Sequence, residues 1–127
     1  MFASIIGIYW YLTSSEYFSK TKHESERWAV IQDTKNDVIA VETSGEDIWI
    51  SLKNLNQNQS EMWVGGIVEE YDNHWGFRFD PDTIITAEIT IEGAQSNIQG
   101  ISEDLNYWIN VWTKQVYVLA KVIEIHE

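Results

Sequence analysis

The sequence predicts a single α+β domain, built mainly from an antiparallel sheet that curls toward a half-barrel and carries one amphipathic helix. Its 127 residues, 44% of them hydrophobic, suit one buried core. Short β-rich runs alternate with turn residues along most of the chain, whereas a helical apolar period is clear only at about residues 95–109. No repeat or linker interrupts the chain, so residues 1–127 are expected to form one domain.

The N-terminal part predicts a buried strand followed by a short helix. Residues 1–12 are apolar, but they are too few to span a bilayer and no basic segment precedes them, which favours a first strand over a signal peptide. Residues 13–16 have the spacing of a capping box and predict a short helix near residues 14–24. Only two large apolar side chains support this helix before Trp28.

Short strands joined by tight turns are expected next. The predicted strands are residues 28–31, 38–41 and 48–50. Turn-forming residues at 35–37 and 44–47 separate these runs closely enough to indicate antiparallel hairpins. Residues 53–61 are rich in Asn and Gln and have little to bury, so they predict an exposed connecting loop.

Alternating apolar and polar side chains predict three strands in the second half of the chain. Trp75, Phe77 and Phe79 share one face of a core strand. Between residues 85 and 91, Ile and Ala alternate with Thr and Glu, a pattern typical of a sheet with one solvated face. The closing strand is expected at residues 116–125. Its apolar face consists of Val116, Val118, Ala120 and Val122.

The helix predicted at about residues 95–109 presents its apolar side chains at intervals of three or four residues. They are Ile98, Ile101, Leu105, Trp108 and Ile109. We expect this stripe to pack on the sheet. Gly100 lowers the helix propensity without excluding the helix.

Two local backbone features are expected beside the core strand. Gly65 and Gly66 lie within an apolar run and indicate a bulge or a close backbone approach. In the turn after the core strand, Pro81 presets φ and Asp80 accepts a backbone hydrogen bond. Asp80 and Asp82 are also candidate Ca²⁺ ligands, but one ion needs about six to eight oxygen atoms, so the turn role is favoured.

Residues 64–68 and 74–84 resemble a family signature, in which a Gly-Arg-Ile-Val-like strand precedes a Trp-Ser-Phe-x-Leu-Asp-Pro-Asp-Ser-Ile-like strand and turn. The second run here reads His-Trp-Gly-Phe-Arg-Phe-Asp-Pro-Asp-Thr-Ile. The family is the small domain at the N-terminus of an amoebal calmodulin-binding protein and in stand-alone bacterial proteins. The resemblance covers roughly residues 48–125 and implies the fold, with no established catalytic activity. Gly93 and Ala94 stand where that family usually has a cysteine, and its Cys-Pro-Trp-like C-terminal element is absent.

Charge and composition exclude several classes of function. Twenty acidic residues against eight Lys and Arg give a formal net charge of −12, which opposes binding to nucleic acid and to anionic membranes and favours a basic protein partner. Without cysteine the chain has no disulfide and no thiolate metal site, which suits a reducing compartment, and we expect a cytoplasmic location. No phosphate-binding glycine loop is present, and no cofactor is expected.

No catalytic constellation is evident along the chain. The three histidines lack the spacing of a zinc site, and no nucleophile elbow occurs. Paired carboxylates are frequent, but acid/base catalysis needs them in a cleft that pushes their pKa values apart. An enzyme alternative would require His74 to share a cleft with Asp72 or Asp80.

The function that the sequence favours is a non-enzymatic binding protein, whose acidic surface docks a basic protein partner as inhibitors and immunity proteins do. The candidate binding residues are charged or aromatic and lie in or next to polar runs. They are Trp63, Glu69, Glu70, Asp72, His74 and Trp112. The alternative is a small-ligand carrier, with an aromatic-lined pocket between the sheet and the 98–109 helix. The sequence leaves the partner and the oligomeric state open.

Overall fold

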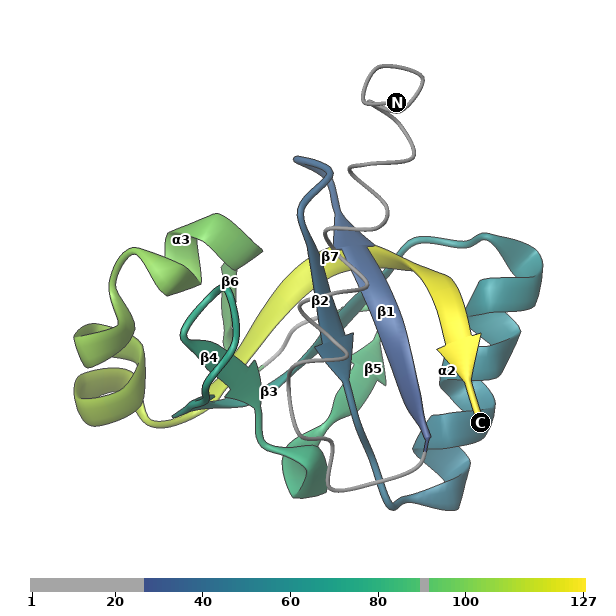
Figure 1. The fold of residues 1–127 in the computed structure, drawn as a ribbon, viewed down its shortest axis with the longest axis horizontal. Helices are drawn as coiled ribbons and strands as arrows, with labels where there is room; N and C mark the ends of the chain where they lie inside the picture. The colour runs from purple at the N-terminus through teal and green to yellow at the C-terminus, as the bar shows by residue number, and fades with distance from the viewer. Residues whose placement is uncertain (1–26, 90–91) are drawn as a thin grey trace, which may run out of the picture.

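A computed structural model describes residues 27–89 and 92–127 (Figure 1). The predicted first strand and the predicted helix near residues 14–24 lie outside the described residues. The described strands are β1 (Trp28–Asp33), β2 (Val38–Val41), β3 (Met62–Glu70), β4 (Phe77–Phe79), β5 (Ile85–Ala87), β6 (Ala94–Ser96) and β7 (Gln115–His126). The helical elements are α2 (Glu46–Asn58), the 3₁₀ turn η1 (Pro81–Thr83), α3 (Ile98–Ser102) and the π-helix η2 (Tyr107–Trp112).

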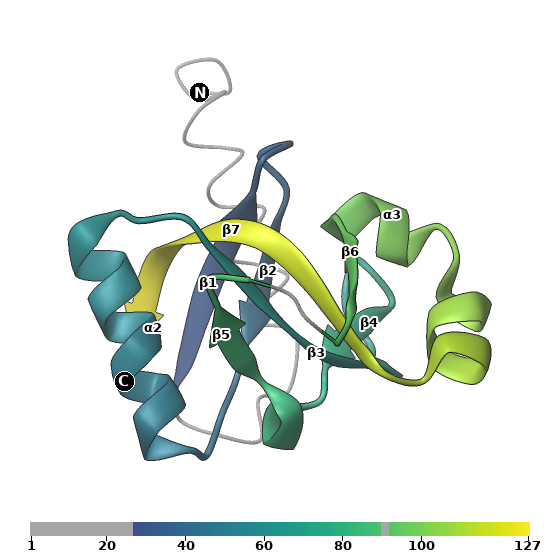
Figure 2. The same ribbon diagram turned by 180° about the vertical axis from the view of Figure 1, so that it is seen from behind.

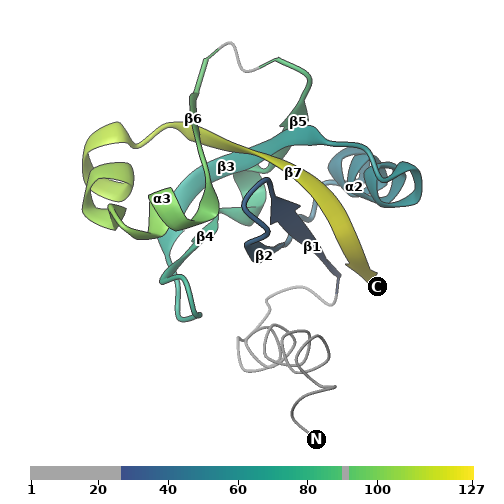
Figure 3. The ribbon, with the colours of Figure 1, turned by 90° about the horizontal axis from the view of Figure 1, so that it is seen from above.

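The seven described strands form one mainly antiparallel sheet in the order β2-β1-β7-β3-β4, with β5 beside β3 and β6 beside β7. Only the β6–β7 pair is parallel among them. The sheet curls into a nearly closed barrel, because the long strand β7 pairs with β3 along its first half and with β1 along its second half. Helices α2 and α3 lie at opposite ends of this barrel (Figure 3). The predicted α+β class with a curled antiparallel sheet is therefore confirmed.

The core fills the space inside this barrel. The apolar face predicted for the closing strand is confirmed, because Val116, Val118, Ala120 and Val122 are all fully buried. Strand β4 contributes Phe77 and Phe79, whose rings pack edge to face at 5.7 Å. The predicted hairpin of β1 and β2 is confirmed as well, with residues 34–37 as its turn.

Strand β3 lies unusually close to its ladder partner β7 at Gly65 and to the turn η1 at Gly66, which explains the paired glycines. A Cβ atom at Gly65 would overlap the carbonyl oxygen of Val116 and lie 2.8 Å from the Cα atom of Tyr117. A Cβ atom at Gly66 would lie 2.8 Å from the hydroxyl of Thr83. Of the two predicted explanations, close backbone approach is the one observed at Gly65.

Helix α2 corrects two predictions, a strand at residues 48–50 and an exposed loop at residues 53–61. Both segments belong mostly to this helix. Its buried side chains are Trp49, Leu52 and Leu55, which are three residues apart and so share one side of a helix. Acidic residues in the first turn also favour a helix start. Residues 48–50 are apolar throughout and therefore resembled a strand. The second half of α2 is rich in Asn and Gln, which contribute to the exposed side of the helix.

Strand β5 is shorter than the alternation predicted, and its faces are reversed. Thr86 pairs with the fully buried Val64 and therefore lies on the core side, as does buried Ile84. Ile85 and Ala87 point the other way and are half-buried. The strand ends at Ala87, so the alternation up to residue 91 does not mark one continuous strand.

The helix predicted at about residues 95–109 is interrupted. Asn97 caps α3 by accepting a 2.8 Å hydrogen bond from the amide of Gly100, so the helix begins at Ile98, after β6. A turn follows α3, and the chain continues as the π-helix η2. The predicted apolar stripe is nevertheless confirmed. Ile98 and Ile101 are fully buried, and Leu105, Trp108 and Ile109 pack against the core.

Candidate functional site

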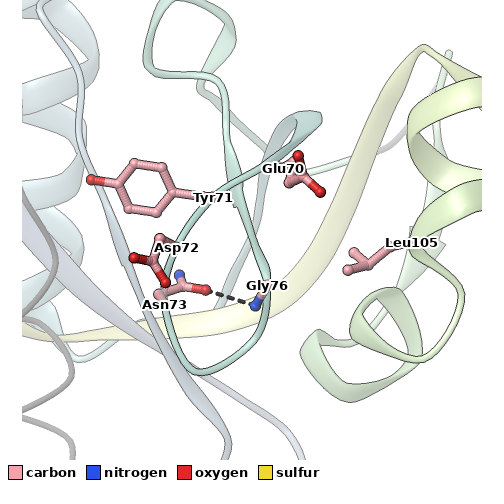
Figure 4. A pocket seen from close by; sticks show the side chains of 6 residues that line it. All are labelled: Glu70, Tyr71, Asp72, Asn73, Gly76 and Leu105. Carbon is pink, nitrogen blue, oxygen red and sulfur yellow. Dashed lines mark hydrogen bonds between the residues drawn. The ribbon is translucent and has the colours of Figure 1, made fainter.

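An acidic depression lies between the β3–β4 hairpin and the chain that follows α3. We call it the hairpin depression, and its volume is about 620 Å³. It is lined by Glu70, Tyr71, Asp72, Asn73, Gly76 and Leu105 (Figure 4). Glu70 and Leu105 lie on the same side of the hairpin, whereas Tyr71 points to the other side.

The hairpin turn is shaped by one asparagine and one glycine. The side-chain oxygen of Asn73 accepts hydrogen bonds from the amides of Trp75 (3.1 Å) and Gly76 (2.8 Å), while its side-chain nitrogen donates to the carbonyl of Phe77 (2.8 Å). Gly76 has a φ of +81°, which a residue with a Cβ atom rarely adopts. A Cβ atom there would also lie 3.1 Å from the side chain of Leu105.

The two walls of the hairpin depression are tied to each other and to the barrel. The hydroxyl of Ser102 in α3 donates a 2.8 Å hydrogen bond to the carbonyl of Trp75 in the turn. The buried carboxylate of Asp33 accepts from the amide of Ile98 at the start of α3 (2.9 Å) and from the amides of Lys35 and Asp37 in the neighbouring β1–β2 turn. Both walls are thus positioned by hydrogen bonds to buried or half-buried groups.

A mostly buried arginine lies beside the hairpin and neutralises part of its charge. The guanidinium of Arg78, whose side chain is 11% exposed, forms a 2.6 Å ion pair with Glu69 and lies 3.7 Å from the buried carboxylate of Glu42. It also lies 4.3 Å from the ring centroid of Tyr71. The charge of Glu69 is therefore directed toward Arg78.

The hairpin depression itself keeps a negative charge. Glu70 and Asp72 are exposed, no lining residue is Lys or Arg, and exposed Glu103 and Asp104 precede Leu105 in the chain. In the neighbouring β1–β2 turn, the pKa of Asp37 is raised by burial and by the negative charge of Asp33.

The six residues predicted for binding do not form one site. Glu70 and Asp72 line the hairpin depression, and Glu69 lies next to them but pairs with Arg78. His74 is exposed in the same turn, with its ring edge-on to Trp75 at 4.7 Å. Trp63 and Trp112 lie elsewhere. Four lining residues were not predicted from the sequence, namely Tyr71, Asn73, Gly76 and Leu105. Of these, the Asn and the Gly were detectable as turn formers.

Trp112 belongs to a second depression, of about 750 Å³, at the end of η2. Its indole nitrogen donates a 2.9 Å hydrogen bond to the carbonyl of Gln115, and the ammonium group of Lys114 lies 5.6 Å from its ring. The other lining residues are Ile67, Glu92, Gly93 and Thr113. Each of the two depressions thus has one aromatic lining residue.

The predicted turn at Asp80 is confirmed. Its carboxylate accepts a 3.0 Å hydrogen bond from the amide of Asp82, and its carbonyl accepts one from the amide of Thr83. Within residues 27–89 and 92–127, no three His, Asp or Glu side chains are grouped so that they could hold a metal ion. His74 and Asp80 do not line the hairpin depression, although Asp72 does.

Among the helices of the described residues, none is both long and apolar enough to cross a bilayer. Comparison of the chain with protein-family models, with curated proteins and with solved structures found no match. The family resemblance noted for residues 48–125 therefore stays a prediction.

Proposed function

We propose that this chain is a non-enzymatic binding protein of the inhibitor or immunity type, which docks a basic protein partner through its acidic surface. The observation that carries the proposal is the hairpin depression. There, the exposed carboxylates of Glu70 and Asp72 accompany an apolar wall at Leu105, and no lining residue is cationic.

This combination suits the side chain of a lysine or an arginine. Such a side chain needs carboxylate oxygens around its charged head and apolar surface along its methylene groups. Glu70 offers a carboxylate and Leu105 an apolar contact, from the same side of the hairpin (Figure 4).

The hydrogen bonds that hold the hairpin also favour binding. The bonds of Asn73 and the bond between Ser102 and Trp75 position the two walls without a partner. A surface that is already in place loses less conformational entropy when a partner binds. The net charge of −12 would add attraction at long range and raise the association rate with a cationic protein, an effect that salt screens.

The test is binding of the immobilised chain to the basic and the neutral protein fractions of the same cells, at low and at high salt. We expect retention of basic proteins that weakens as salt rises. The variant Glu70→Gln/Asp72→Asn should lose about tenfold in affinity, mainly through slower association.

A matched control separates local from global charge. Asp72 and Asp47 are both exposed, but Asp47 lies in the first turn of α2, away from the hairpin depression. Asp72→Asn should weaken binding and Asp47→Asn should leave it nearly unchanged. Equal effects of the two substitutions, or binding that does not respond to salt, would contradict the proposal.

A further inference from the structure

The apolar side chains of β5, Ile85 and Ala87, face the outside of the barrel and form part of an apolar strip there. Trp63 of β3 pairs with Ala87 of β5 on one side and with Leu119 of β7 on the other, and Ile85 lies opposite Gly65 on the same face. We call Trp63, Ile85, Ala87 and Leu119, together with Ile89 just beyond β5, the outer strip. Its four strand residues are half-buried, and Ile89 is 72% exposed.

The described helices lie at the two ends of the face that carries the outer strip, where α2 contacts β5 and β7. Figure 2 looks onto this side of β3, β5 and β7, with α2 and α3 at the two ends. One neighbour on the same face is covered, since Tyr117 is only 5% exposed. The chain at Gly93 lies directly against its ring, and burial and the charge of Glu92 raise the pKa of its hydroxyl. The cover at Gly93 stops short of Leu119, which stays half-buried.

Charge distinguishes the occupants that could cover an apolar face of this kind. Exposed carboxylates at Glu61, Glu88 and Glu92 flank the outer strip along the chain, against one exposed ammonium group at Lys121. A second copy of this chain would bring the same excess of carboxylates and a further net charge of −12, so the two would repel. A partner with apolar side chains between Lys or Arg residues would complement both the strip and its rim.

We propose that the outer strip is a second docking surface, onto which a basic protein places an apolar side chain flanked by Lys or Arg. The inference rests on the proposed function for the charge of the partner, but it concerns a different face of the barrel. Trp63 is the main anchor, because a tryptophan in the middle of an apolar patch tends to carry much of the binding energy. Polar residues at the rim exclude water and supply the charge preference.

The test uses three defined peptides and NMR spectra of the full chain. One peptide has a central Leu-Trp-Leu segment between lysines, one replaces the lysines by glutamates, and one replaces the apolar centre by serines. We expect only the first to bind, with shifts of the Trp63 indole and of the Ile89 and Leu119 methyl groups. The substitution Ile89→Ser should reduce its affinity about tenfold.

The chain offers a matched control for that substitution. Ile50 is 50% exposed on α2, so Ile50→Ser removes the same exposed side chain away from the outer strip. Because Ile89 is exposed, Ile89→Ser should fold normally. Equal affinities of the two variants, equal binding of the acidic peptide, or a dimer that Ile89→Ser dissociates would each overturn the proposal.

The variant Glu70→Gln/Asp72→Asn separates this inference from the proposed function. If the outer strip acts as proposed, this variant still binds the apolar basic peptide. If the peptide shifts only the NMR signals of residues in the hairpin depression, the outer-strip proposal is overturned and the proposed function stands. Shifts of NMR signals at the outer strip, together with salt-independent binding of cellular proteins, would overturn the proposed function and leave the outer strip standing.

Discussion

The indole nitrogen of Trp75 donates a 2.7 Å hydrogen bond to the carbonyl oxygen of Val38. Trp75 precedes β4 and Val38 begins β2, and these strands are the two ends of the main strand order, between which no strand pairing is observed in the described residues. The pair Arg78 and Glu42 spans the same gap. Side chains therefore bridge the barrel where backbone ladders do not.

Trp75→Phe tests the role of this bond. Phenylalanine keeps most of the apolar ring but leaves the carbonyl of Val38 without its donor, so we expect a loss of about 1–3 kcal/mol in the free energy of unfolding, measured by urea denaturation. Trp63→Phe makes the same chemical change on the outside of the barrel and should cost under about 0.5 kcal/mol. Similar losses in both variants would show that ring size, and not the hydrogen bond, matters.

Gly65→Ala should damage the pairing of β3 with β7. The added methyl group would overlap backbone atoms of Val116, which cannot move without breaking the ladder, so we expect a cost of about 3 kcal/mol or a failure to fold. Gly45→Ala is the comparison, because its nearest neighbour would lie at an ordinary 3.4 Å, and it should cost at most about 1 kcal/mol for a poorer helix cap. Thermal melts of the two variants check this order, and a stable Gly65→Ala protein would refute the close approach of the two backbones at Gly65.

Phe77→Ala should remove a large part of the stability. The side chain is fully buried and packs on Phe79, so its loss leaves a cavity that costs about 3–5 kcal/mol. Asp82→Asn, at the exposed turn, should cost little because the backbone amide of Asp82 makes the observed bond. Melting curves of the two variants, recorded with and without calcium, test these expectations. A rise in melting temperature with calcium that is lost only in Asp82→Asn would contradict the turn role of Asp82.

Asp37→Asn should stabilise the protein at neutral pH. Burial and the neighbouring Asp33 raise the pKa of Asp37 above 3.8 in the folded chain, so between the unfolded and the folded pKa the folded state holds more protons. The stability from protonated Asp37 is thus fully present below about pH 3.8 and is lost as the pH rises through the folded pKa. The difference in melting temperature between variant and parent should be small in acid and should grow toward pH 7. A difference in melting temperature that does not change with pH would contradict the raised pKa of Asp37.

Local sequence signals sufficed where a segment is decided by its own turns and alternation. The β1–β2 hairpin follows from short β-rich runs separated by turn formers, and the closing strand β7 from a period of two residues. The core strand with Phe77 and Phe79 follows from the same period, but Trp75, which was predicted on that strand, lies in the turn before it. The turn at Asp80 follows from proline geometry, and the acidic character follows from composition. For the candidate site, the sequence identified Glu70 and Asp72. It could not show that the carboxylate of Glu69 is paired with Arg78.

Tertiary contacts decided the remainder. The run around Trp49 is short enough to suit a strand or a helix, and burial of Leu52 and Leu55 against the barrel selects the helix. The face of β5 depends on its register with Val64, and a shift of one residue would turn every side chain to the other side. Leu105 lies against Gly76 of the hairpin although the two residues are 29 positions apart in the chain, because Asp33 and Ser102 hold α3 beside the turn. Such pairings carry no local signal, since packing between distant segments selects among arrangements that each segment alone permits equally well.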